Sequence, residues 1–346
     1  MLKLEDVHFS YHKREVLRGA SLEVPCGEVI ALLGRTGCGK STAIRLLAGL
    51  EMPARGRVFV GNSAVAGDGF TFVAPEQRNV GIVFQSLALW PHMTVLGSLE
   101  FVSGEGKAAG GAARSILEEL GIAHLADRRP GALSGGESAL AAVARALAQS
   151  PRALLLDEPF SGLDATRRAE IRGRVFALAR ERNLPLLYVT HLRHEVLSSA
   201  DRLAVMADGR VQQCAAPYEV YCRPATAEVA RLTGEVSFLS AEVTAQNIVT
   251  PIGAFNRSAS PNAEQLGTGW KGLVALRPES LRLAGDGRLA GRVRDAEFSA
   301  GRWRLRIGGV GPGGSEVQVD SDSKLGVGAE VRLNLVGDLA LVAGRA

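Results

Sequence analysis

The chain has 346 residues, of which 46% are hydrophobic and 22% are charged, so it is long enough for two globular domains. Its formal net charge of +4 is too small to favour nucleic acid as a partner, and we expect none. The four cysteines lack C-x-x-C spacing and no apolar run approaches 18 residues, which argues against a zinc site, a disulfide framework and a membrane-spanning helix.

Residues 1 to about 235 have the pattern of one α/β domain. Short apolar runs predict strands at 2–9, 20–24, 29–33, 153–156 and 186–190, with a helix at 40–50. Several of these runs stop at polar residues, which is typical of parallel strands that carry a site at their carboxyl ends. The Ala-rich stretch 103–147 should be mostly helical apart from the loop around 130–136, and we expect a helical subdomain at about 86–150.

The pattern changes from about residue 236 onward. Glycine becomes frequent, and short alternating runs appear at 302–307, 316–319 and 330–335. Turn signals such as Gly-Gly and Gly-Pro-Gly-Gly separate these runs. Residues 236–346 are therefore expected to form a second domain, a small β-barrel or β-sandwich.

Residues 34–41 read GRTGCGKS and match the phosphate-loop pattern G-x-x-x-x-G-K-[ST] at every fixed position. The glycines let backbone N–H groups converge on phosphate oxygens at a helix N-terminus. Lys40 would reach the β- and γ-phosphates, and the Ser41 hydroxyl would ligate Mg²⁺. The candidate nucleotide-binding residues here are Gly34, Arg35, Thr36, Gly37, Cys38, Gly39, Lys40, Ser41 and Thr42.

Two acidic residues follow the apolar run at 153–156 in the sequence LLLDEP. An Asp at the end of such a strand holds Mg²⁺ in phosphate-loop ATPases, so we assign Asp157 to the metal. The adjacent Glu158 can accept a proton from the attacking water, and we predict that it is the general base.

Further motifs resemble those of the ABC ATPases. Residues 133–137 (LSGGE) resemble the LSGGQ signature, and residues 161–164 (SGLD) resemble the D-loop. Gln85, in VGIVFQ, resembles the Q-loop glutamine, and His191, in YVTH, resembles the switch histidine. Tyr11 lies where that family has an aromatic residue that stacks on adenine. The complete order covers about the first two-thirds of the chain.

This resemblance implies a phosphate-loop NTPase fold, ATP and Mg²⁺ as cofactors, and a homodimer that encloses two ATP molecules. His191 would hold the γ-phosphate and the attacking water, and Gln85 would contact Mg²⁺. The signature lies too far from the phosphate loop of its own chain, so it would serve the ATP of the partner subunit. The residues expected to act in trans are Ser134, Gly135, Gly136, Glu137 and Asp164.

Three longer segments, 75–95, 200–226 and 274–283, resemble importer ATPases that carry a C-terminal TOBE domain, an OB-like regulatory barrel. The resemblance implies a peripheral subunit on the cytoplasmic face of the inner membrane, bound to permease subunits and supplied by an extracytoplasmic binding protein. Solutes of this subfamily include ferric iron, polyamines, oxyanions, sugars and glycerol phosphates. The charged N-terminus agrees with the absence of an export signal.

The sequence departs from that family at Leu140, where Arg is common, at Leu192, where Asp is common, and in 101–133, which is shorter. Leu140 and Leu192 keep one alternative open, a nucleotide-binding regulator with little turnover. A separate alternative is a soluble ABC ATPase of DNA repair or translation. The arginine-rich C-terminal domain has two interpretations, a site for a regulatory ligand or a dimerisation platform with solvated arginines.

Overall fold

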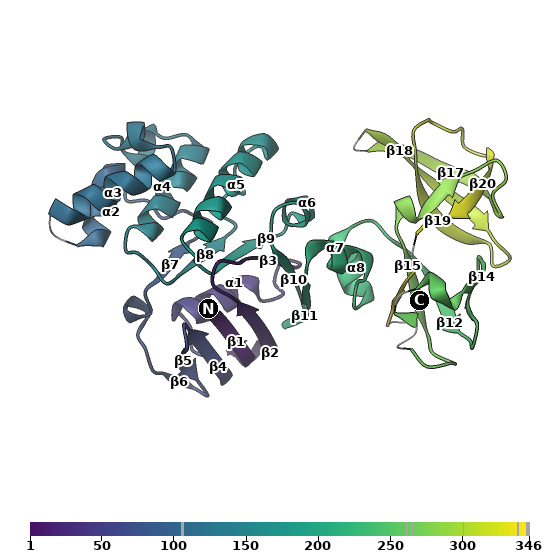
Figure 1. Cartoon of the computed structure of the whole chain (residues 1–346), viewed down its shortest axis with the longest axis horizontal. Coiled ribbons are helices and arrows are strands. Elements are labelled where there is room, and N and C mark those ends of the chain that lie inside the picture. The colour runs from purple at the N-terminus through teal and green to yellow at the C-terminus, as the bar shows by residue number, and fades with distance from the viewer. Residues whose placement is uncertain (105–106, 261, 264–265, 300, 338, 344–346) are drawn as a thin grey trace. The chain divides into compact units, whose positions relative to one another are not determined.

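The structure, a computed structural model, describes residues 1–343 apart from 105–106, 261, 264–265, 300 and 338. The chain forms two compact units, Met1–Pro217 and Tyr218–Ala346, which are described separately (Figure 1). The expected domain boundary near residue 235 lies 18 residues beyond Pro217 (235 − 217) and stays a prediction. Among the described residues, every helix is too short or too polar to cross a bilayer.

The first unit contains a mixed sheet with strand order β11-β10-β3-β9-β8-β7, in which only β11 runs antiparallel to its neighbour. Every residue of β3 and β9 is buried, because helices and a second sheet leave no face of these central strands in water. The strands are β3 (Val29–Leu33), β7 (Val80–Val83), β8 (Ala153–Asp157), β9 (Leu186–Thr190), β10 (Arg202–Ala207) and β11 (Arg210–Ala215).

An antiparallel sheet with the order β2-β1-β4-β5-β6 shares its core with the first sheet. Its alternating burial pattern, seen best in β1, is typical of a sheet with one buried and one exposed face. The strands are β1 (Leu2–Tyr11), β2 (Arg14–Val24), β4 (Arg55–Val60), β5 (Ser63–Gly67) and β6 (Phe70–Thr71).

The helices of this unit fall into two groups (Figure 1). Helices α2, α3 and α4 pack on one another away from the antiparallel sheet. In the other group, α1 lies against strands of both sheets, and α5 and α6 lie against β3. The helices are α1 (Lys40–Ala48), α2 (Val95–Ser103), α3 (Lys107–Glu119), α4 (Gly135–Leu147), α5 (Ala165–Glu181) and α6 (Arg193–Leu197), with 3₁₀ turns at Pro75–Gln77, Ala123–Leu125 and Pro130–Ala132.

The second unit has two five-stranded antiparallel sheets, with the orders β14-β13-β12-β15-β21 and β16-β20-β17-β18-β19, that share one apolar core. Two helices, α7 (Pro217–Cys222) and α8 (Ala227–Thr233), precede them. The strands are β12 (Ser237–Val243), β13 (Asn247–Thr250), β14 (Gly253–Asn256), β15 (Lys271–Leu276), β16 (Leu281–Leu283), β17 (Leu289–Ser299), β18 (Arg302–Val310), β19 (Ser315–Ser321), β20 (Glu330–Leu335) and β21 (Ala340–Val342), with 3₁₀ turns at Arg257–Ala259 and Pro278–Ser280.

The predicted α/β domain followed by an all-β domain is confirmed, and several element bounds need correction. Helix α1 ends at Ala48 rather than at residue 50, because Gly49 adopts φ 86° and terminates it. The loop expected at 130–136 ends earlier, since α4 begins at Gly135. The helical stretch begins earlier than expected, at Val95.

Candidate functional site

The phosphate loop joins β3 to α1 and takes its shape from glycine. Gly37 and Gly39 have φ values of 81° and 113°, which only glycine adopts without strain. A Cβ at Gly39 would also lie 2.6 Å from a methyl group of Leu17, so there is no room for a side chain. The backbone therefore folds tightly over the start of α1, with its N–H groups near the positive end of the helix dipole.

Lys40, the first residue of α1, is 6% exposed. Its Nζ atom donates to the carbonyl oxygens of Gly34 at 2.8 Å and Arg35 at 3.0 Å. These hydrogen bonds hold the ammonium against the backbone of the phosphate loop, so the loop fixes its position in the absence of a nucleotide. An ammonium held inside a glycine-rich turn is suited to bind phosphate oxygens as a point charge.

The Ser41 Oγ donates to Asp157 Oδ1 at 3.2 Å, which brings together two oxygen atoms from residues that are 116 positions apart in the sequence. Burial raises the pKa of Asp157, because the ionised carboxylate has lost water without gaining a charged partner of matching strength. Hard oxygen donors in this setting fit Mg²⁺, which takes one or two carboxylates and completes its shell with water and phosphate. A hydroxyl and one carboxylate leave coordination positions open, so this donor pair suits an ion that is shared with phosphate oxygens.

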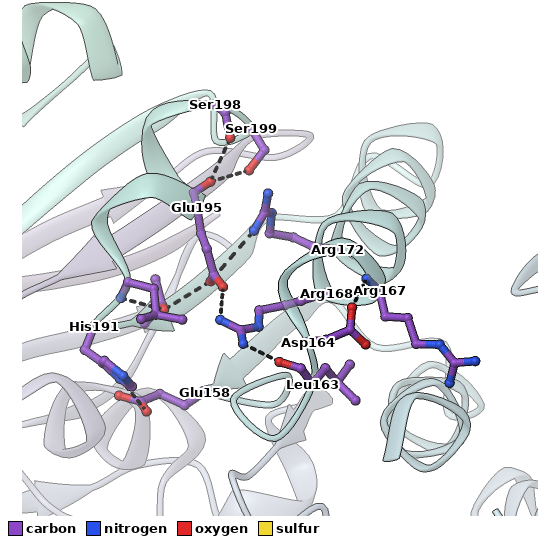
Figure 2. Close-up of polar contacts among 12 residues, drawn as sticks. Glu158, Leu163, Asp164, Arg167, Arg168, Arg172, His191, Glu195, Ser198 and Ser199 are labelled. Atoms are coloured by element: carbon purple, nitrogen blue, oxygen red, sulfur yellow. Dashed lines mark hydrogen bonds and ion pairs between the residues drawn. The ribbon is translucent and has the colours of Figure 1, made fainter. Parts of the chain in front are cut away.

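Glu158 and His191 come from neighbouring parallel strands. In the register of β8 and β9, Asp157 lies opposite Val189, which places the next residues of both strands at one sheet edge. His191 Nδ1 is 2.9 Å from Glu158 Oε2 (Figure 2). Glu158 has φ 49°, an uncommon value for a residue with a side chain, and its N–H donates to the Val189 carbonyl at 3.1 Å. The sheet thus fixes a carboxylate and an imidazole in hydrogen-bonding contact.

A cavity of about 630 Å³ brings most of the predicted site residues together. It collects the phosphate loop, the glutamine after β7, and the polar residues after β8 and β9. Its lining residues are Tyr11, Arg14, Val16, Thr36, Gly37, Gly39, Lys40, Ser41, Thr42, Gln85, Glu158 and His191.

Arg14 and Val16 also line this cavity, although sequence reasoning did not select them. Arg14 faces Tyr11 across the β1–β2 hairpin, and the basic run at 12–14 was the only signal for it. The Tyr11 hydroxyl donates to Glu51 at 3.0 Å, and its ring is 4.7 Å from that of Phe9. The hairpin therefore presents an aromatic face and a cation at the mouth of the cavity.

The signature residues lie elsewhere, since none of residues 134–137 is among the described residues that line the cavity. Ser134 caps α4 in a capping box: its backbone N–H donates to Glu137 at 2.7 Å, and its hydroxyl accepts from the Glu137 N–H at 3.4 Å. Hydrogen bonding of the carboxylate to the backbone N–H and the side chain of Ser134 lowers the pKa of Glu137. Asp164 similarly caps α5, accepting from the Arg167 N–H at 3.0 Å. Both segments are therefore preformed helix starts outside the cavity.

Two of the three sequence departures, Leu140 and Leu192, lie outside the lining of the cavity. Leu140 is a buried residue of α4, 5% exposed. Leu192 contributes to the His191 loop through its backbone, because its N–H donates to the Thr190 hydroxyl at 3.1 Å. Cys38 lies within the phosphate loop, and burial raises the pKa of its thiol, which opposes a reactive thiolate there.

Comparison with known proteins gives consistent matches in both units. The family described as "ABC transporter" matches residues 17–161, and the family described as "TOBE domain" matches residues 274–342. A trehalose/maltose import ATP-binding protein of Thermococcus litoralis is 37% identical over 95% of this chain and 94% of its own length. An Fe(3+) ions import ATP-binding protein of Pseudomonas fluorescens is 37% identical over 97% of this chain and 96% of its own. The solved structure of cbiO1 from Clostridium perfringens, part of an ABC transporter complex, is 28% identical with a TM-score of 0.58, covering 63% of this chain and 89% of that one.

Proposed function

The chain belongs to the ATP-binding subunits of ABC transporters, of the importer type with a C-terminal TOBE domain, and from this premise we propose that two copies close around two ATP molecules while bound to a permease. It is an ABC transporter ATPase that acts within a transporter complex. The observation that carries the proposal is the separation of two half-sites. The cavity gathers the phosphate loop, Glu158 and His191, whereas Ser134–Glu137 lie outside it.

We assign the reaction steps to side chains that line the cavity. Lys40 and the loop N–H groups bind the β- and γ-phosphates, and Tyr11 stacks on the adenine ring. Glu158 accepts the proton of the attacking water, and His191 orients that water against the γ-phosphate. The 2.9 Å contact between Glu158 and His191 supports this division, because both groups already face the same point.

Mg²⁺ would be held by Ser41, Asp157 and Gln85. When bound, it neutralises charge on the β- and γ-phosphate oxygens. Ser41 and Asp157 are already in contact, and Gln85 lines the same cavity at the end of β7. These residues orient the phosphates, and the chain supplies the proton acceptor separately through Glu158.

Two-fold closure would complete each site with the partner's signature. The N-terminus of α4 offers N–H groups of Gly135 and Gly136 to an anion, and Asp164 lies in the second preformed helix start. A dimer of identical subunits meets this requirement with two equivalent sites. We place the complex at the cytoplasmic face of the membrane, with an extracytoplasmic binding protein that delivers the solute.

We propose a small solute as the cargo, and the relatives do not narrow it to the ferric iron, polyamine and oxyanion classes that the sequence favours. Relatives named for a sugar and for ferric iron are equally similar to this chain, at 37% identity. We therefore infer that the ATPase subunit does not contact the solute, and that the permease and binding protein select it.

The test compares Mg-ATP turnover of the wild-type chain with Glu158→Gln, using Glu181→Gln, an exposed position at the end of α5, as the matched control. We expect slow turnover in the wild type and the control. Glu158→Gln should bind ATP, lose at least about a hundredfold in turnover, and accumulate as a dimer in light scattering. Full turnover in Glu158→Gln would refute the assignment of the base. ATP binding without turnover in the wild type would instead favour the regulator.

A further inference from the structure

A buried carboxylate outside the cavity connects two loops of the nucleotide site (Figure 2). Glu195, in helix α6, is 2% exposed. Its Oε1 accepts from Arg168 Nη1 at 2.8 Å, and its Oε2 accepts from the Tyr188 hydroxyl at 2.8 Å. A second guanidinium, that of Arg172, lies 3.7 Å from Oε2. A buried carboxylate so fully partnered is held in one position, because moving it would strand buried charges.

One branch of this cluster leads to the loop at 161–164. Arg168 donates through Nη2 to the Leu163 carbonyl while its Nη1 pairs with Glu195. The planar guanidinium therefore bridges a carboxylate and a backbone oxygen with one rigid group. The Leu163 side chain also approaches the signature, because a Cβ added at Gly135 would lie 3.2 Å from its Cδ2.

The other branch leads to the loop that carries His191. The Thr190 hydroxyl donates to Glu195 Oε2 at 3.3 Å and accepts from the Leu192 N–H at 3.1 Å. Thr190 and Leu192 flank His191, so the carboxylate controls the backbone on both sides of the histidine. His191 in turn reaches Glu158 at 2.9 Å.

We propose that Glu195 is a positioning residue that, through Arg168 and Thr190, holds the loop 161–164 and the His191 loop in one fixed relation. The inference rests on the proposed function, because it assigns the cluster an effect on ATP turnover. A shift of the 161–164 loop is passed to His191, since the carboxylate between them is buried and the planar guanidinium, whose side chain is 13% exposed, is held at both of its ends. Contact of that loop with a partner subunit thereby adjusts the histidine that orients the water.

The test replaces Arg168 with Lys in the full chain. A lysine can still pair with Glu195, but its single ammonium cannot hold the Leu163 carbonyl in the same planar geometry. The matched control is Arg174→Lys in the same helix, where the arginine binds Glu170 and the Leu120 carbonyl.

We expect Arg168→Lys to lower kcat by about tenfold, the scale on which small misplacements of reacting groups act. The KM for Mg-ATP and the unfolding temperature should stay close to those of Arg174→Lys. A cluster that serves stability alone would give the opposite pattern, with a lower unfolding temperature and an unchanged kcat, and that result would overturn the proposal.

A double-mutant cycle with His191→Ala shows whether the effect passes through the histidine. In single-turnover experiments, Arg168→Lys should change the rate by less than about twofold in the His191→Ala background. A tenfold loss in that background would overturn the proposal. A second readout needs no turnover: in NMR spectra of the nucleotide-free chain, the His191 ring resonances should move in Arg168→Lys and stay in place in Arg174→Lys.

Failure of this inference is distinguishable from failure of the proposed function. A wild-type chain without turnover would overturn the proposed function and the inference with it. An active wild-type chain whose Arg168→Lys variant has unchanged turnover and an unmoved His191 resonance would overturn the inference alone.

Discussion

Replacing Arg78 with Met should strongly destabilise the first unit. Arg78 is 2% exposed, and its guanidinium binds the far end of α1. Nη1 donates to the carbonyls of Leu46 at 2.7 Å and Leu47 at 3.1 Å, and Nε donates to the Val73 carbonyl at 3.1 Å. The same cation lies at the negative end of the α1 dipole.

The expected loss follows from these three bonds. The Leu47 and Val73 carbonyls would lose their side-chain donor at a cost of at least about 1 kcal/mol each, whereas the Leu46 carbonyl keeps the Gly49 N–H, so the sum is about 2 kcal/mol. Methionine fills much of the same volume, which limits any additional cavity cost. Arg152→Met, at an exposed position without comparable contacts, should change the free energy of unfolding by less than about 0.5 kcal/mol.

Urea unfolding measures this difference, provided that the transition of the first unit is identified. ATP should raise the midpoint of that transition alone, because only the first unit contains the phosphate loop. A loss below about 1 kcal/mol for Arg78→Met, or one equal to that of Arg152→Met, would refute the hydrogen-bond reasoning.

Three further predictions concern other parts of the chain. Gly49→Ala should lower the free energy of unfolding by about 2–3 kcal/mol, because φ is 86° and the new Cβ would lie 2.6 Å from Arg78 Nε. Urea unfolding should show a smaller loss when the same change is made in an Arg78→Met background. Arg277→Met should destabilise the second unit by about 3 kcal/mol, since this buried guanidinium binds the carbonyls of residues 221, 230 and 235 and a threonine hydroxyl. The rise in the unfolding midpoint of the first unit on addition of ATP should stay the same. Unaltered urea unfolding of the second unit would contradict this prediction. Burial raises the pKa of the Cys38 thiol, so the protonated thiol stabilises the folded chain below the pKa that the thiol has in the unfolded chain, and this contribution is lost as the pH rises through the higher folded-state pKa. Iodoacetamide at pH 8 should therefore label exposed Cys26 faster than Cys38, and equal rates by mass spectrometry would count against this interpretation.

The sequence predicts the local parts of the site well, because their chemistry is contained in short motifs. The phosphate loop needs glycine at φ values that other residues avoid, and its spacing is readable without a structure. The acids after 153–156 and the histidine after 186–190 could likewise be selected, because polar residues that follow buried strands mark one edge of a parallel sheet. Their 2.9 Å contact could not be predicted, since it depends on β8 and β9 being neighbours.

Long-range partners were missed for the same reason. Glu195 and Arg168 are 27 residues apart and meet only after α5 has packed over the sheet. A single buried arginine such as Arg78 has no sequence signature either, because its acceptors are backbone carbonyls. The end of α1 was predicted two residues too late, at residue 50, although Gly49 is a signal for it, since a glycine that follows an apolar helix commonly terminates the helix.

The contact between His191 and Glu158 has a consequence for the rate at which a subunit outside a closed dimer hydrolyses ATP. The carboxylate that we assign as the proton acceptor already holds the imidazole, so a lone subunit must exchange this bond before water can be activated. We therefore expect the resting rate to be set by how often that exchange occurs rather than by the chemistry of the phosphate. A cell that contains many such subunits would therefore hydrolyse little ATP through them in the absence of transport.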